Sequence, residues 1–133
     1  MDVVWTMTSL ESGRFVPTER RSEVSELVAD FNELRSSGQG YLEIRLPVGE
    51  FPQLTLGFRD DHAVVHLIGD GGDMSLLVGD GAISSDTVVD VPIMDDLAEF
   101  TGDFILSVDH AWGVVGQFIE RGAVEDLGEW YEL

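Results

Sequence analysis

Hydrophobic positions repeat with the period of an α-helix over residues 22–36. The spacing is i, i+3, i+4, i+7, which places the apolar side chains on one face. Ser22 is a suitable N-cap, and Gly38 or Gly40 ends the pattern. The residues on the predicted buried face are Val24, Leu27, Val28, Phe31 and Leu34.

Alternation of apolar and polar residues, which is typical of half-buried strands, dominates the segments around this helix. It predicts strands over residues 2–9, where it is weak, and over residues 41–46 and 53–59. A more continuous apolar run predicts a strand over residues 63–68, and a further strand is expected over residues 74–78. Residues 10–21 are expected to form a loop, because Gly13 and Pro17 interrupt them. The four strands after the helix are joined by short turns, so they predict an antiparallel meander.

The pattern is looser after Gly79. Residues 88–91 are expected to form a strand, residues 92–102 a short helical turn or an irregular segment, and residues 104–108 an extended one. Asp109 is expected to cap a second helix, which ends at Gly122 in a left-handed C-cap. The residues predicted to share its buried face are Trp112, Val115, Phe118 and Ile119.

The C-terminal residues 127–133 are expected to return as a strand. There is no internal repeat or linker, so residues 1–133 are predicted to form a single domain. We expect an α+β fold, with one mostly antiparallel sheet and two amphipathic helices packed on one face.

Composition excludes several classes of function. The chain of 133 residues has no Cys, and all seven of its basic residues are Arg. A disulfide framework, a thiol nucleophile and a Schiff-base lysine are therefore impossible. The formal net charge of −19 disfavours direct binding to nucleic acid. No apolar stretch is long enough to span a membrane, and residues 1–5 lack the basic region with which a signal peptide begins, so we expect a cytoplasmic protein.

The negative charge is concentrated in the second part of the chain. Residues 1–59 carry nine acids and six Arg, whereas residues 60–133 carry seventeen acids and one Arg. Thirteen acids lie between Arg59 and Arg121 with no basic residue among them. Such a field attracts cations at long range. It is also what the surface of a halophilic protein, or plain selection for solubility, would produce.

The side chains that could carry chemistry do not form a known catalytic pattern. On one strand, His62 and His66 would lie about 13 Å apart, too far to share a metal ion. The Asp- and Gly-rich turns at residues 69–73 and 79–81 lack the register of a calcium-binding loop. Since no nucleophile motif or phosphate-binding loop is found either, we expect no catalytic activity and no cofactor or metal.

The last third of the chain resembles the first-numbered family of polymorphic-toxin immunity proteins, which are often paired with deaminase-type toxins. In that family an extended segment enters a helix that ends in Phe-x-x-x-Gly, and a Trp follows eight residues after the Gly. Phe118, Gly122 and Trp130 keep this spacing here. Glu125 stands where the family usually has a Pro.

The resemblance implies an intracellular antitoxin that binds its cognate toxin and blocks it. Complementary charge would then favour a toxin domain with a cationic cleft as the partner. The alternative is an acidic adaptor or ligand-binding domain of a halophile without a toxin partner. The residues expected to contact a partner are acids on turns, with two aromatic side chains as anchors: Asp60, Asp61, Asp70, Asp73, Asp80, Asp86, Asp95, Asp96, Trp130 and Tyr131.

Overall fold

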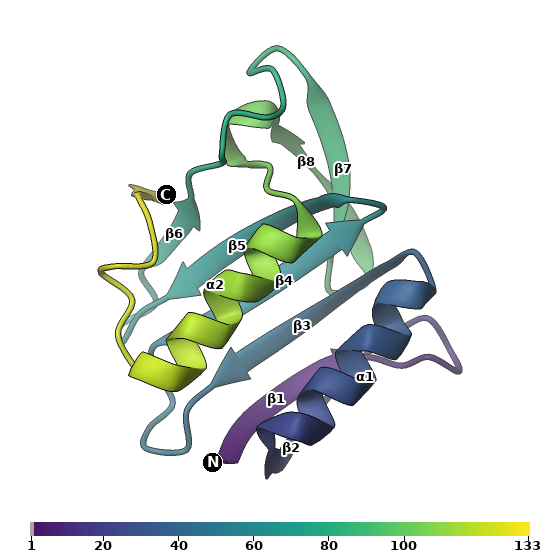
Figure 1. Cartoon of the computed structure of the whole chain (residues 1–133), viewed down its shortest axis with the longest axis vertical. Helices are drawn as coiled ribbons and strands as arrows, with labels where there is room; N and C mark the ends of the chain where they lie inside the picture. Colours follow the sequence, from purple (N-terminus) through teal and green to yellow (C-terminus); the bar gives the residue numbers. More distant parts are fainter. Residues whose placement is uncertain (1) are drawn as a thin grey trace.

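A seven-stranded antiparallel sheet carries the two helices of the chain on one face (Figure 1). The computed structural model describes residues 2–133. In chain order its elements are β1 (Asp2–Thr8), β2 (Phe15–Glu23), α1 (Val24–Ser36), β3 (Gln39–Arg45), β4 (Gln53–Arg59), β5 (His62–Ile68), β6 (Met74–Leu77), β7 (Val88–Ile93), β8 (Asp96–Thr101), the 3₁₀ helix η1 (Gly102–Phe104), α2 (Val108–Arg121) and β9 (Trp130–Glu132).

The strand order in the main sheet is β2-β1-β3-β4-β5-β6-β9, and every neighbouring pair is antiparallel. The meander predicted from the alternating segments is therefore confirmed for β3 to β6. The α+β class is confirmed as well. The strands β7 and β8 form a separate two-stranded sheet.

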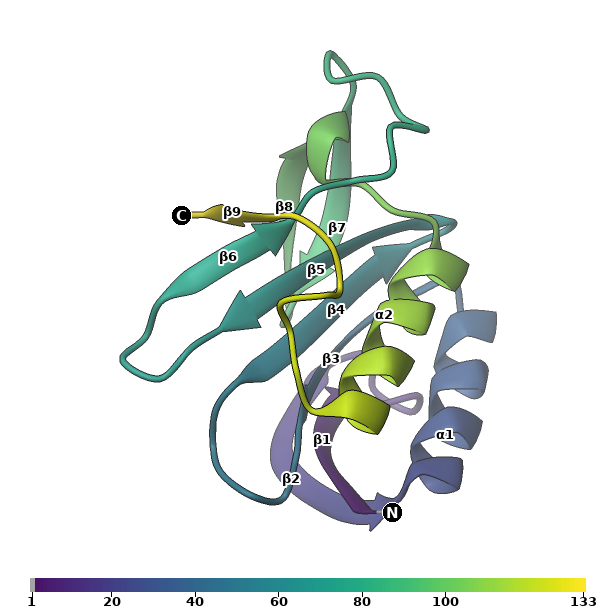
Figure 2. The ribbon, with the colours of Figure 1, turned by 60° about the vertical axis from the view of Figure 1, so that its left-hand side comes forward.

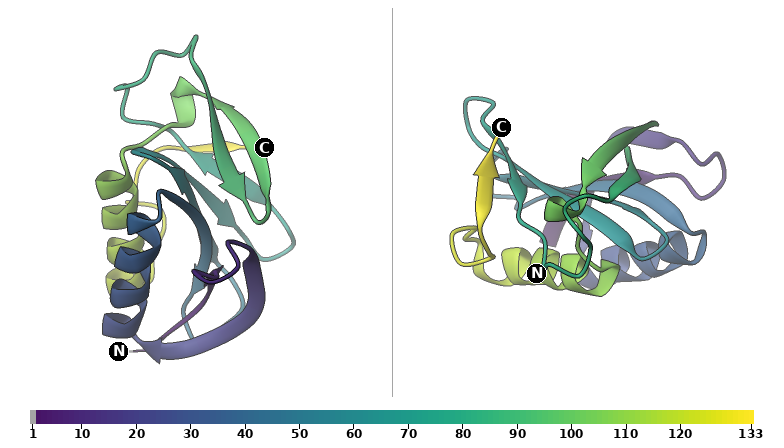
Figure 3. Two further views of the ribbon diagram at one scale, coloured as in Figure 1. Left: turned by 90° about the vertical axis from the view of Figure 1, so that its right-hand side faces the viewer. Right: turned by 90° about the horizontal axis from the view of Figure 1, so that it is seen from above.

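The main core lies between the sheet and the helices. Figure 3 shows α1 and α2 side by side on one side of the sheet, with the β7–β8 hairpin on the other. Phe31 on α1 is fully buried. Its ring stacks on Trp112 of α2 with centroids 3.9 Å apart and meets Phe58 of β4 edge-on at 5.7 Å. This aromatic group joins both helices to the sheet.

The predicted apolar face of α1 is confirmed for Leu27, Phe31 and Leu34, which are buried, and for Val24, which packs against the core, whereas Val28 is only half-buried. Its start was predicted wrongly. The helix begins at Val24, after Glu23, and Ser22 does not cap it. The side chain of Ser22 instead accepts a hydrogen bond of 2.9 Å from the Trp5 indole N–H. The Ser22 hydroxyl, which was predicted to cap α1, thus binds a side chain of β1 instead.

Residues 10–21 were predicted as a loop, and most of them form β2, an exposed edge strand. The strand is polar on both faces and contains Pro17, so it lacks the alternation by which strands are recognised. Pro is tolerated there because an edge strand need not donate every N–H. The pairing with β1 is irregular between Trp5 and Met7.

The second helix begins at Val108, and its cap is Ser107 rather than the predicted Asp109. The Ser107 hydroxyl accepts a hydrogen bond of 3.1 Å from the His110 N–H. The end of the helix is as predicted: Gly122 has a φ of 72° and its N–H donates to the Phe118 carbonyl. Before the helix, the predicted extended segment is partly η1, and Leu106 then forms a bridge to Ala63.

Residues 92–102 were predicted as a short helical turn or an irregular segment, but most of them complete the β7–β8 hairpin. This hairpin crosses the sheet on the face opposite the helices (Figure 2). Gly57 on β4 makes the crossing possible, because a Cβ there would lie 2.2 Å from the Pro92 carbonyl oxygen. A smaller core forms beneath the hairpin from Val64, Leu76, Val91 and Ile105.

Candidate protein-binding surface

Five exposed aspartates gather where α2 begins, and we call this region the acidic end. Asp60 and Asp61 come from the β4–β5 turn, which lies beside the start of α2 in Figure 1. The other three come from the loop after β6, from η1 and from the first turn of α2. The acidic end consists of Asp60, Asp61, Asp80, Asp103 and Asp109.

Hydrogen bonds hold several of these carboxylates in place. Asp61 Oδ1 accepts from the Val108 N–H at 3.2 Å, so it ties the β4–β5 turn to the helix. The backbone N–H of Ala82 and the nearby His110 lower the pKa of Asp80 below its ordinary value, although partial burial opposes them. These contacts hold Asp61 and Asp80 in place, and those of Asp80 favour its ionised form.

Arg35 is the only arginine in an ion pair with the acidic end, among the residues that the structure describes. Its guanidinium donates to Asp109 at 2.7 Å from the last turn of α1. The other ion pairs of arginine link Arg20, Arg21 and Arg45 to acids of the first part of the chain. The remaining carboxylates of the acidic end thus face solvent without a guanidinium partner.

The other predicted acids lie elsewhere. Asp70 and Asp73 occupy the β5–β6 turn, at the far end of β5 from Asp61. Because β5 has seven residues, the two turns are about 20 Å apart. Asp86 lies in the loop that leads into β7. The fold therefore divides the predicted acids between both ends of the sheet.

Asp95 and Asp96 lie at the turn between β7 and β8. Asp95 has a structural contact, since its Oδ1 accepts a hydrogen bond of 2.7 Å from the Phe15 N–H at the start of β2. This bond ties the tip of the hairpin to the edge strand. Asp96 is exposed and begins β8.

Of the two predicted aromatic anchors, one points inward and one outward. Trp130 packs against the main core, and its indole N–H donates to the Val124 carbonyl at 2.9 Å. Tyr131 lies on the other side of β9, is 55% exposed and contacts Phe104 with ring centroids 5.4 Å apart. Only Tyr131 is available to a partner.

One pair of acids was not singled out from the sequence. Asp90 and Glu99 are exposed and stand directly opposite each other on β7 and β8. Like charges at such positions destabilise a strand pair. Nothing in the sequence pattern revealed the pairing, because residues 92–102 were not predicted to form a strand.

The histidines do not assemble a metal site. His66 is buried on β5 and meets Phe100 edge-on, and burial lowers its pKa. His110 lies 3.3 Å from Asp80. Nowhere in residues 2–133 do three or more His, Asp or Glu side chains come together as a metal-binding group.

A buried polar network lies on the face of the sheet opposite the helices. The Tyr41 hydroxyl donates to Glu43 at 2.8 Å, and the Thr6 hydroxyl donates to the other carboxylate oxygen at 3.3 Å. Burial and this contact raise the pKa of Tyr41 far above its ordinary value. Tyr41 is buried and its hydroxyl is engaged within the fold, so this network is structural.

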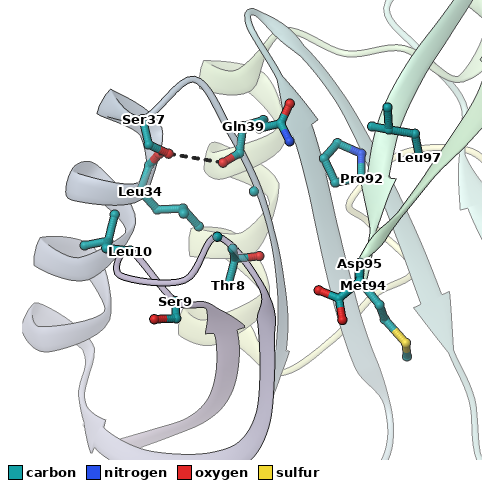
Figure 4. Close-up of a pocket in the computed structure, with 12 residues that line it drawn as sticks. Thr8, Ser9, Leu10, Leu34, Ser37, Gln39, Pro92, Met94, Asp95 and Leu97 are labelled. Carbon is teal, nitrogen blue, oxygen red and sulfur yellow. Dashed lines mark hydrogen bonds between the residues drawn. The ribbon is translucent and has the colours of Figure 1, made fainter.

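Two cavities meet at the loop between β1 and β2, and together we call them the Leu10 groove. The larger, of about 550 Å³, lies between this loop, β2 and α1. The smaller, of about 250 Å³, lies between the loop, the end of α1 and the tip of the β7–β8 hairpin (Figure 4). Thr8, Ser9 and Leu10 line both cavities. No local sequence pattern predicted this groove, because its walls come from segments far apart in the chain.

No known protein family and no curated protein matches this chain. Neither helix in residues 2–133 is long and apolar enough to cross a membrane.

Proposed function

We propose that the protein is an immunity protein, which binds the catalytic domain of a cognate secreted polymorphic toxin and neutralises it. It acts in the cytoplasm of the cell that makes it, by stoichiometric binding and without turnover. The resemblance of residues 104–130 to the immunity family favours a deaminase-type toxin. Toxins that act on nucleic acids need a cationic cleft for their substrate, and an acidic protein is complementary to it.

The observation that carries this proposal is the lack of guanidinium partners at the acidic end. Its residues are exposed, although the side chain of Asp80 is partly buried beside His110, and only Asp109 has an arginine partner within the described chain. An uncompensated field of this kind costs stability through self-repulsion. A cationic partner would remove that cost on binding, so the free energy of association includes the relief of repulsion.

The same field would speed the encounter. Complementary potentials raise association rates by about tenfold to a thousandfold over those of neutral surfaces. Rapid capture is what a cell needs when it synthesises its own toxin. The anchoring of Asp61 and Asp80 by hydrogen bonds reduces the entropy lost when these side chains meet a partner.

Neutralising substitutions at the β4–β5 turn test the proposal. In the double variant Asp60→Asn, Asp61→Asn, the amide oxygen at position 61 can still accept from Val108. Asn also tolerates the positive φ of 54° at position 60. We expect association with the toxin domain encoded beside this protein to slow several-fold at low salt, because steering is weakened. Stopped-flow binding and survival of cells that express the toxin domain measure this.

The matched control is Glu125→Gln, Asp126→Asn, an adjacent pair of exposed acids beyond the other end of α2. It removes the same charge, so a purely global effect of net charge would slow both variants equally. Equal rates for the two variants would remove the acidic end from the interface. If the wild-type protein neither binds nor protects against the neighbouring toxin, the immunity function is wrong and the acidic adaptor becomes the better account.

A further inference from the structure

The Leu10 groove gathers apolar side chains that the fold leaves exposed. Leu10 and Val16 are 48% and 40% exposed in its larger part, and Met94 and Leu97 are 50% and 52% exposed in its smaller part. These are four of the ten large hydrophobic side chains that are exposed in the described chain. Grouped apolar exposure with a polar rim is typical of an interaction site.

The rim of the groove is acidic. Glu11, Asp30 and Glu33 line the larger cavity, and Asp95 lines the smaller one. The single basic residue on the lining is Arg20. Its guanidinium pairs with Asp30 and lies 3.9 Å from the centre of the Trp5 ring, so it is already engaged within the protein.

The shape of the groove suits a chain segment rather than a single side chain. Its two cavities share Leu10 and extend from Arg20 on β2 to the tip of the β7–β8 hairpin. Figure 4 shows Leu10 on the side of α1 and Leu97 on the side of the hairpin, with the cavity between them. An occupant that fills both cavities would therefore contact β1, β2, α1 and the tip of the hairpin.

We propose that the Leu10 groove binds a basic amphipathic segment of a protein partner. Its apolar side chains enter the two cavities, and its Lys or Arg side chains meet the carboxylates of the rim. The charge selects this occupant: an acidic peptide would be repelled by Glu11, Glu33 and Asp95. A second copy of this chain is disfavoured because each copy carries a net charge of −19.

This inference goes beyond the proposed function, because the Leu10 groove and the acidic end are two separate surfaces formed by different elements. The acidic end is built around the start of α2, whereas the groove is built from β1, β2, α1 and the hairpin tip. A toxin could use both surfaces, and another partner could use the groove alone. Separate variants therefore test the two surfaces.

The test is a titration of ¹⁵N-labelled protein with a synthetic peptide of about ten residues that alternates Leu with Arg. We expect amide shifts to concentrate at Leu10, Val16, Glu33 and Leu97. A peptide with Ser in place of Leu should bind at least about tenfold more weakly, since it cannot fill the cavities. A peptide with Glu in place of Arg should not bind.

Variants of the protein locate the site. Leu10→Ser with Leu97→Ser should weaken binding of the Leu–Arg peptide by about tenfold or more. The matched control, Val48→Ser with Met74→Ser, removes two exposed apolar side chains outside the groove and should leave binding unchanged. The dispersion of the amide spectrum shows that each variant is folded.

Three results would overturn the inference. The first is that the Leu–Arg peptide does not bind even at millimolar concentration. The second is that its shifts centre on Asp60, Asp61 and Asp80, which would make the contact one of charge alone. The third is that the groove variant binds as tightly as its control. A toxin that still binds a protein with a defective groove leaves the proposed function intact.

Discussion

The two parts of the chain, residues 2–59 and 60–133, differ in how their charges are placed. In the first part, Arg20, Arg21 and Arg45 each pair with an acid of the same part. The Arg45 guanidinium donates twice to Glu19, at 2.8 and 3.1 Å, and this contact lowers the pKa of that carboxyl. In the second part only Asp109 pairs with an arginine, and that residue, Arg35, belongs to α1 in the first part.

This difference shows that the ion pairs and the apolar core are distributed differently over the two parts of the molecule. The two parts share one core, in which Phe31 from the first stacks on Trp112 from the second. Burial of apolar surface stabilises both parts alike, whereas ion pairing stabilises mainly the first. The common core thus stabilises the second part despite its unpaired acids.

The largest effect should come from removing the contact that joins the parts. Phe31 is 0% exposed, and Phe31→Ala should lower the free energy of unfolding by about 3–5 kcal/mol. Urea denaturation at equilibrium measures the change. The neighbouring exposed residue provides the control, since Asn32→Ala should alter stability by about 0.5 kcal/mol or less. A stability of Phe31→Ala close to that of the wild type would contradict the shared core.

A smaller loss of stability is expected from a substitution at Gly57, where the β7–β8 hairpin crosses the sheet. Gly57→Ala would place a methyl group 2.2 Å from the Pro92 oxygen, so the hairpin must shift. Such overpacking costs about 1–3 kcal/mol. Gly113→Ala on α2 is the control, because its Cβ would meet nothing within 4 Å. It should stabilise the protein by about 0.5–1 kcal/mol, so the two substitutions should move the thermal midpoint in opposite directions.

The smallest effect concerns the charges themselves. Asp90→Asn with Glu99→Gln removes the opposed carboxylates of β7 and β8 and should raise the free energy of unfolding by about 0.2–1 kcal/mol at low salt. The gain should fade near 1 M salt, where the screening length is about 3 Å. Glu19→Gln in the first part should lower the free energy of unfolding, because it breaks the ion pair with Arg45. If both variants were less stable than the wild type, the contrast between the two parts would be wrong.

The sequence was most informative where an element buries apolar side chains. The strands β4 and β5 are buried on both faces and α1 on one, and the apolar residues that this burial requires are what predicted these elements. The polar edge strand β2 has no buried face to create a pattern. Ser22 was misassigned as a cap because a tertiary contact with Trp5 engages its hydroxyl. Asp109 was misassigned because Ser107, two residues earlier, caps the helix locally.

The candidate surfaces were harder to predict than the fold. The sequence identified the unpaired acids, but the division of Asp61 and Asp70 between opposite ends of β5 depends on strand pairing. The Leu10 groove combines residues up to about ninety positions apart, such as Leu10 and Leu97, and no local pattern connects them. Gly57 was the one local sign of the crossing hairpin, since a glycine within a strand often marks a close approach of backbone.

The separate pairing of β7 with β8 has a consequence for motion. The hairpin shares no strand ladder with the seven-stranded sheet, and an isolated two-stranded hairpin is only marginally stable. It is held by the side chains beneath it and by the bond from the Phe15 N–H to Asp95. We therefore expect the hairpin to open as a local unit at a lower free energy than the sheet. One wall of the Leu10 groove would then be adjustable, and the width of the groove would follow the basic segment that we propose it binds.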